Sequence, residues 1–201
     1  MAEKMMVLEK EAFHLEPNRE EVYQWLRLQP QLPVWKAFDR EWERALALFG
    51  QKVWFRGFAW LRGESEAAVF LTLGGEVDRA VEQAFAQGQY VLASLLNTLA
   101  DQSLFQMDMQ AGRLLEERWS LQGKYIGART EAPMDYPLER QRALLAEKNL
   151  PGVTVYESGL FQPTKSLLYC LAITNQPVQG QSTHDCSRCE KTNCPYRGYR
   201  R

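Results

Sequence analysis

Helical and strand-like hydrophobic patterns occur in separate blocks along this chain, and their order is the feature that most limits its fold. Apolar residues recur at helical spacing before residue 50, and two strand-like runs follow at 53–61 and 67–73. Helical spacing then returns from residue 76 to about residue 109. Because there is no regular β-α-β alternation, the pattern predicts an α+β fold rather than a doubly wound parallel sheet.

The longest apolar stripe predicts the central helix of the fold. It runs from Tyr90 to about Met109. Gly112 weakens its continuation, although Leu114, Leu115 and Trp119 can extend or restart the helix. Upstream, the tryptophan-rich stripe over 34–49 has the spacing of a helix that is buried against a core. We therefore expect a twisted, mostly antiparallel sheet packed with long helices, and a helical segment at the N-terminus.

The chain after residue 120 predicts a loop, a helix over 138–148 and two strands. The strands are expected at Val153–Ser158 and Ser166–Ile173, on either side of a turn that contains a proline. In such a hairpin Glu157 and Ser158 at one strand end face Lys165 and Ser166 at the other. Their simplest role is to satisfy backbone groups.

Composition excludes several classes of protein. The chain has 201 residues, of which 45% are hydrophobic and 24% are charged, as in an ordinary globular protein. Its net charge of -1 predicts no general affinity for nucleic acid. No apolar stretch approaches the ~20 residues that span a bilayer, and the first residues lack the apolar core of a secretory signal. We expect a cytoplasmic protein with no membrane or nucleic-acid partner.

A cluster of cysteines close to the C-terminus predicts a metal site. Cys186, Cys189 and Cys194 form a C-x2-C-x4-C pattern, whose thiols can converge on one zinc ion or iron-sulfur cluster. The fourth ligand is either His184, which is nearby, or Cys170, which lies in a predicted strand. Free, redox-active or disulfide-bonded thiols are the alternatives, and a reducing cytoplasm disfavours disulfides.

Several short segments stand in an order that is shared with one protein family. They are Leu71–Asp78, Ala100–Asp101, the loop around Arg129, Tyr136–Leu138, Tyr156–Ser158, Pro163–Ser166 and the tail Cys194–Arg197. In this order the chain resembles the cobalamin (vitamin B12)-dependent methionine synthase activation-domain family, and more narrowly its short, stand-alone members of anaerobic bacteria. The resemblance implies an activation-like domain over 1–180 and a Cys-rich metal-binding tail over 181–201.

The resemblance also implies a function. Activation domains bind S-adenosylmethionine and present it to an oxidised cobalamin, which is reductively methylated on a separate domain. A stand-alone member would therefore be an accessory protein for corrinoid-dependent methyl transfer, with a corrinoid protein or a cobalamin-dependent methyltransferase subunit as its partner. Reactivation and electron delivery are the expected roles, because iron-sulfur centres reach the low potentials that cobalt reduction requires. Cobalamin would be met only through the partner.

The same resemblance places the ligand pocket at Arg129, Glu157 and Ser158. In the family the S-adenosylmethionine loop reads Arg-x-x-Pro-Gly-Tyr, whereas here Pro133 is followed by Met134. Without that glycine the backbone cannot approach a ligand as closely. A second hypothesis is therefore a non-enzymatic adaptor with a degenerate S-adenosylmethionine pocket and a structural zinc site. In that case Arg129 is an ordinary ion-pair arginine.

Overall fold

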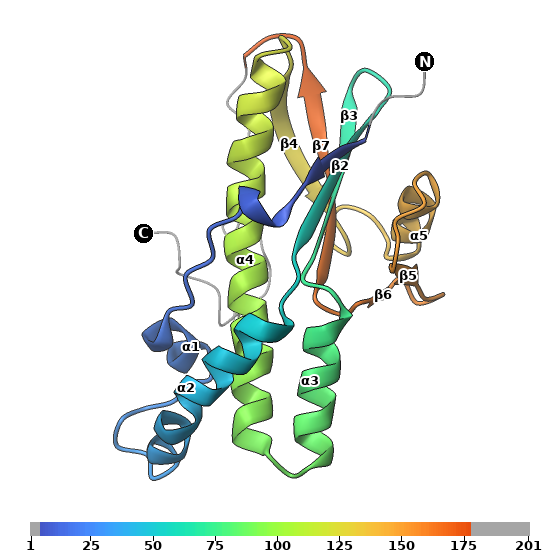
Figure 1. Cartoon of the computed structure of the whole chain (residues 1–201). Coiled ribbons are helices and arrows are strands. Elements are labelled where there is room, and N and C mark those ends of the chain that lie inside the picture. Colours follow the sequence, from blue (N-terminus) through green and yellow to red (C-terminus); the bar gives the residue numbers. More distant parts are fainter. Residues whose placement is uncertain (1–4, 178–201) are drawn as a thin grey trace.

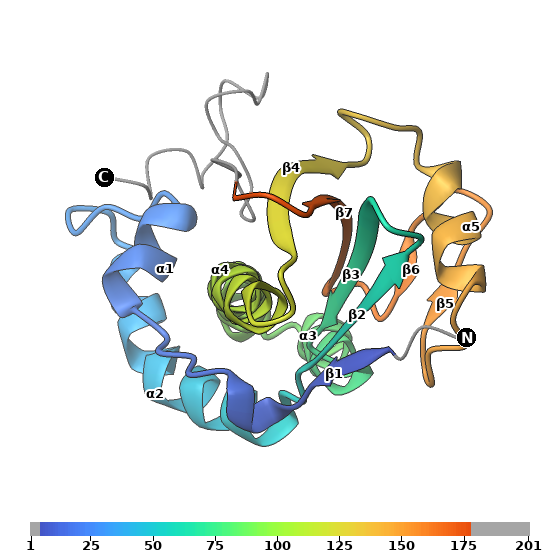
Figure 2. The ribbon, with the colours of Figure 1, turned by 90° about the horizontal axis from the view of Figure 1, so that it is seen from above.

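The computed structural model describes residues 5–177 and shows an α+β fold, as the sequence predicts. The long helix α4 lies along one face of a sheet, and a smaller layer lies on the other face (Figures 1 and 2). The helices are α1 (Arg19–Trp25), α2 (Trp35–Lys52), α3 (Gly75–Ala86), α4 (Tyr90–Ser120) and α5 (Glu139–Ala146), with a short 3-10 helix at Lys10–Ala12.

The sheet has five strands in the order β1-β2-β3-β7-β4, and every neighbouring pair is antiparallel. The strands are β1 (Met6–Leu8), β2 (Arg56–Arg62), β3 (Glu66–Thr72), β4 (Tyr125–Glu131) and β7 (Ser166–Thr174). Side chains along each strand point alternately to the two faces of the sheet, so the residues of the sheet form two sets. One set faces α4 and the other faces α5.

Helix α4 is the centre of the larger core. The other helices of the N-terminal half and the segment that follows β1 form an arc around it, and the sheet closes the remaining side (Figure 2). Its 31 residues continue through Gly112 to Ser120. The helix extends past the predicted end because Ala111, Leu115 and Trp119 are buried on the same stripe. Their burial outweighs the cost of about 1 kcal/mol for one glycine.

A smaller core lies between the sheet and α5. Phe70 of β3 contacts Phe161 edge-to-face at 5.6 Å between ring centroids, and Leu144 of α5 packs against the same face. Gly159 allows this layer to close, because a Cβ at its position would lie 2.5 Å from the carbonyl oxygen of Leu138. Its φ of 81° also favours glycine.

The hairpin predicted near the C-terminus is wrong, because its two strands do not pair with each other. β5 (Thr154–Val155) pairs with β6 (Phe161–Gln162), and β7 pairs with β3 and β4 instead. The strand predicted over 153–158 is only two residues long, because the chain turns at residues 157–158. Long-range pairing with β3 therefore overrides the local hairpin signal.

Candidate functional site

Three of the short segments whose order was noted in the sequence meet at one end of the sheet. They are the end of β3 with the start of α3, the middle of α4, and the segment that leads into β7. The residues that join them, named here the β3–β7 junction, are Thr72, Asp78, Asp101, Thr164, Lys165 and Ser166. This convergence of distant segments is not visible from the sequence alone.

Asp78 and Asp101 hold the junction together. The buried carboxylate of Asp78 accepts hydrogen bonds from both the backbone N–H and the hydroxyl of Thr164, each at 2.7 Å. Lys165 donates from Nζ to Asp101 at 2.7 Å, so α4 is tied to the start of β7. A buried carboxylate with two donors is satisfied, and these two acids therefore act in positioning the chain.

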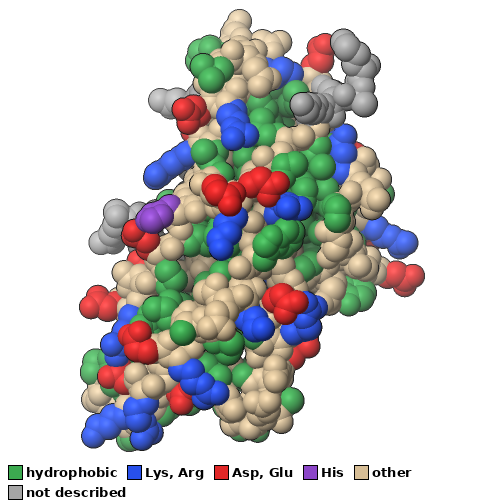
Figure 3. Space-filling model, in the orientation of Figure 1, with side chains coloured by type: hydrophobic (Ala, Val, Ile, Leu, Met, Phe, Trp, Pro, Cys, Tyr) green, Lys and Arg blue, Asp and Glu red, His purple; other side chains and the backbone are tan. Residues whose placement is uncertain are grey.

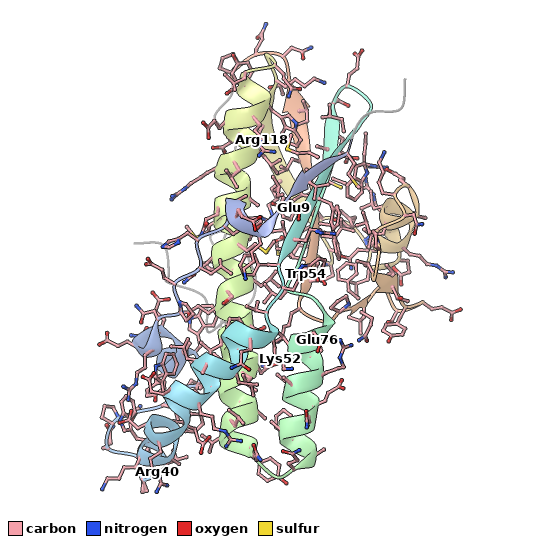
Figure 4. All side chains as sticks on the ribbon, viewed as in Figure 1. Glu9, Arg40, Lys52, Trp54, Glu76 and Arg118 are labelled. Atoms are coloured by element: carbon pink, nitrogen blue, oxygen red, sulfur yellow. The ribbon has the colours of Figure 1, made fainter. Side chains whose placement is uncertain are left out.

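The strand end at the junction is tightly packed. Ser166 donates a hydrogen bond to Thr72 across β3 and β7 at 2.9 Å. Gly74 follows with a φ of 76°, and a Cβ there would lie 3.0 Å from the carbonyl oxygen of Trp54. Trp54 precedes β2 and Glu76 lies in the first turn of α3 (Figure 4).

Arg129 lies beside the larger core, where its guanidinium meets acids of α4 and β4. Its guanidinium donates to both carboxylate oxygens of Asp108 at 2.8 and 2.9 Å, and to Glu131 at 2.8 Å. It also stacks on the ring of Tyr169, with 3.7 Å from Cζ to the ring centroid. These four residues are named the Arg129 cluster. Only 4% of the Arg129 side chain and 3% of the Asp108 side chain are exposed.

The electrostatics of the Arg129 cluster are those of a buried ion pair. Burial raises the pKa of Asp108, and Arg129 opposes that effect. The pKa of Tyr169 is raised mainly by burial and further by the neighbouring Asp108, so its phenol stays neutral. The acids raise the pKa of Arg129 despite its burial, so its charge is fixed. Among the described residues Arg129 therefore forms a buried ion pair with Asp108 and Glu131.

The opposite face of the sheet carries a pocket of about 660 Å³. It is named the sheet-face pocket, and it is lined by Arg62, Ser65, Glu66, Ala128, Thr130, Glu147 and Ala172. The strand register explains this set, because Glu66 pairs with Ala172 across β3 and β7. Thr130 and Ala128 flank Arg129 in β4, so that strand presents its arginine to one face and its small residues to the other.

The pocket carries charges of both signs. Arg62 donates to Glu147 at 2.7 Å and also contacts Glu66, and Arg140 reaches Glu66 at 3.3 Å. The hydrogen bond from Arg62 holds the pKa of Glu147 below its usual range, and the same bond raises the pKa of Arg62. These side chains remain partly exposed, so a ligand can reach them.

The structure does not bring Glu157 and Ser158 together with Arg129. Both lie in the exposed turn between β5 and β6, on the α5 side of the sheet. Arg129 points to the α4 side, where Asp108 holds it. The three residues therefore lie on different faces of the sheet. Lys165, expected opposite Glu157, binds Asp101 instead.

Cys170 is the one predicted metal ligand within the described residues. It lies in β7, only 1% exposed, and faces the smaller core. Burial raises its pKa to about 11, so the thiol is protonated at neutral pH when no metal is bound. Within residues 5–177 no group of three or more potential metal ligands occurs. Cys186, Cys189, Cys194 and His184 lie outside the described residues.

Sequence reasoning missed most of the charged residues that matter here. Asp108 and Glu131 look like ordinary polar positions on a helix and in a loop, because the strand β4 was not predicted. Gly127 and a bulge between Ile126 and Arg129 hide its alternation. A usable signal existed for the pocket, since Arg62 and Glu66 are opposite charges at the two ends of the turn predicted between two strands.

Comparison with known proteins identifies no family. A scan of the sequence against models of protein families finds no match, and a search of curated proteins finds no relative. Within residues 5–177 no helix combines the length and apolar character needed to cross a bilayer. Acidic and basic side chains are intermixed on the face shown in Figure 3, without an extended region of one sign.

The chemistry that the sheet-face pocket offers is binding. Its arginine and its two glutamates can pair with a ligand that has both a carboxylate and a cationic group. Its floor residues Ala128 and Ala172 are small, so a ligand can lie close to the sheet. The hydroxyls of Ser65 and Thr130 add hydrogen-bond partners, and the lowered pKa of Glu147 makes its carboxylate a weaker base.

Proposed function

We propose that this chain is an accessory protein for corrinoid-dependent methyl transfer, acting in reactivation of a corrinoid protein or in electron delivery to it. The observation that carries the proposal is the β3–β7 junction. Residues drawn from Leu71–Asp78, Ala100–Asp101 and Pro163–Ser166, which resemble the activation-domain family, hold one another by direct hydrogen bonds. Segments that act together in space support a resemblance better than separate matches do.

The sheet-face pocket supports a ligand of the expected kind. S-adenosylmethionine carries a carboxylate, an ammonium group and a sulfonium, and the pocket offers Arg62 for the first and Glu66 and Glu147 for the cations. A volume of about 660 Å³ lies within the ordinary range of small-molecule sites. The proposed ligand site is therefore this pocket, in place of the set predicted from Arg129, Glu157 and Ser158.

The proposed reaction needs an electron donor. One electron reduces cob(II)alamin to cob(I)alamin, which takes the methyl group from S-adenosylmethionine and leaves S-adenosylhomocysteine. Cys186, Cys189 and Cys194 would hold an iron-sulfur cluster or zinc, with His184 or Cys170 as the fourth ligand. The burial of Cys170 in β7 favours His184. An iron-sulfur cluster would deliver the electron and zinc would not.

The experiment is a methylation assay with protein that has been purified and kept under anaerobic conditions. Protein, S-adenosylmethionine, a low-potential reductant and a corrinoid protein charged with cob(II)alamin are mixed, and visible absorption follows methylcobalamin formation. We expect faster formation with this protein than without it, and loss of the gain in Arg62→Gln but not in the exposed Arg113→Gln. No acceleration would overturn the proposal.

One observation favours a second function, that of a non-enzymatic adaptor. Arg129, the arginine that resembles the family's ligand-binding residue, is locked in the core by Asp108 and Glu131. Metal analysis of the same anaerobic protein separates the two functions. Broad visible absorption with bound iron supports the first, whereas a colourless protein with stoichiometric zinc supports the adaptor. Protein that contains neither metal would contradict the metal site in both.

A further inference from the structure

Helix α4 holds the segment between β1 and α1 by a repeated hydrogen-bond pattern. This segment, Glu9–Asn18, is named the arm, and it crosses α4 in Figure 1. Three glutamines spaced four residues apart each accept from the N–H and donate to the C=O of one arm residue. The pairs of distances are 2.7 and 2.6 Å for Gln110 with His14, 3.0 and 2.9 Å for Gln106 with Glu16, and 3.0 and 3.3 Å for Gln102 with Asn18.

The spacing of this glutamine ladder matches an extended chain. Four residues of an α-helix rise about 6 Å, and glutamines at such positions project from one face. Two residues of an extended chain rise about 6.6 Å, so every second arm residue meets the next glutamine. The partners are main-chain groups, so the ladder recognises an extended backbone whatever its side chains.

Apolar side chains on the alternate positions complete the contact. Phe13 is buried and contacts Phe55 edge-to-face at 6.2 Å between centroids, and Leu15 packs against the same core. The side chains of His14 and Glu16, which alternate with these two residues, point outward and are 86% and 79% exposed. The arm is therefore bound as a short peptide would be, with backbone bonds for affinity and alternate side chains for specificity.

We propose that the glutamine ladder is a peptide-binding site, filled in a single molecule by its own arm and able to accept the arm of a second copy when its own arm is displaced. Its contacts are to backbone groups and to two apolar side chains that every copy carries. This inference is independent of the proposed function, because it uses neither the sheet-face pocket nor the β3–β7 junction.

The test uses the full chain and a fluorescently labelled synthetic peptide of residues 8–19. The variant Phe13→Asp with Leu15→Asp displaces the arm and leaves the ladder intact. We expect this variant to keep its helical circular dichroism and to bind the peptide at least ~10-fold more tightly than the wild type, whose site is occupied. Equal binding by the folded variant and the wild type would overturn the proposal.

A third change tests the glutamines themselves. Adding Gln106→Leu to the displaced variant removes two hydrogen bonds and should weaken peptide binding about 10-fold, since each bond contributes modestly. Adding Gln122→Leu, which lies just beyond α4, should leave binding unchanged. If Gln106→Leu has no effect, apolar contacts alone hold the arm and the ladder is not a recognition site.

Hydrogen exchange of the wild-type chain tests the proposal without any substitution. The amides of His14, Glu16 and Asn18 should exchange together, through an opening that leaves α4 protected. Exchange of these amides only with global unfolding would show that the arm never leaves the ladder, and would also overturn the proposal.

Discussion

Two arginines on opposite faces of the sheet each lie between two carboxylates, and they differ in exposure. Arg129 binds Asp108 and Glu131 in the larger core, where 4% of the arginine side chain is exposed. Arg62 contacts Glu66 and Glu147 beside the sheet-face pocket, and 24% of its side chain is exposed. The two sites share a charge pattern, yet only the second is open to a ligand.

The difference shows how burial divides structure from function. A buried charge that loses its partner is very costly, so the Arg129 cluster is committed to the fold. A partly exposed pair contributes little to stability because water and salt screen it, so the charges of the pocket can change partners at small cost. Arginine identity alone therefore does not mark a ligand site, and the position of its side chain does.

The largest expected effect comes from removing the buried arginine. Arg129→Met leaves Asp108 and Glu131 without their cation in the core. We expect the free energy of unfolding to fall by about 3–5 kcal/mol, measured by urea denaturation. The matched variant Arg62→Met should lose at most about 1 kcal/mol. Equal losses of unfolding free energy in the two variants would show that Arg129 and Arg62 do not differ in their contribution to stability.

A smaller effect is expected where the α5 layer closes. Gly159→Ala puts a methyl group against the carbonyl of Leu138 and forces a left-handed backbone on alanine. We expect a loss of about 2 kcal/mol, with faster hydrogen exchange in α5 than in α4. Gly123→Ala has a similar φ but meets nothing within 4 Å, so its loss should be about half as large.

If α5 and α4 instead lose protection to the same extent in Gly159→Ala, the two faces of the sheet are not independent. That outcome would contradict the assignment of one face to stability and the other to binding.

The smallest effect is a pH dependence in the pocket. The pKa of Glu147 is lowered in the folded chain by Arg62, so its ionised form contributes stability above the ordinary pKa of about 4.3. This contribution is lost as the pH falls through the lowered value. The wild type should exceed Glu147→Gln in stability by at most about 1 kcal/mol at pH 7, and the gap should close in acid.

Parallel denaturation curves of the two proteins from pH 7 to pH 2 measure this gap. A gap that grows as the pH falls would have the wrong sign, and would show that Glu147 is not held in its ionised form by Arg62.

Much of the fold could be predicted from sequence because its helices and inner strands have clear periods. The helical stripes suffice to predict α2 and α4, and the apolar runs suffice to predict β2 and β3. The edge strands could not be predicted in the same way, because β1 is only three residues long and β4 contains Gly127 and buries Arg129. Local patterns also could not show that β7 inserts between β3 and β4.

The site was less predictable because its residues come from distant segments. The spacing of Gln102, Gln106 and Gln110 was visible, but their extended partner was not. Arg129 was found through a resemblance, and only the fold shows that it points to the core. Glu157 and Ser158 were misplaced by the hairpin prediction, since the chain turns there and pairs β5 with β6.

Calorimetric titration with S-adenosylmethionine tests the central claim most directly, that the sheet-face pocket is the ligand site. The wild type should release or absorb heat with a saturable isotherm, and Ala128→Leu, which fills the pocket, should abolish it. Ala86→Leu, an exposed substitution at the end of α3, should bind as the wild type does. No heat at millimolar ligand, or unchanged binding by Ala128→Leu, would contradict the account.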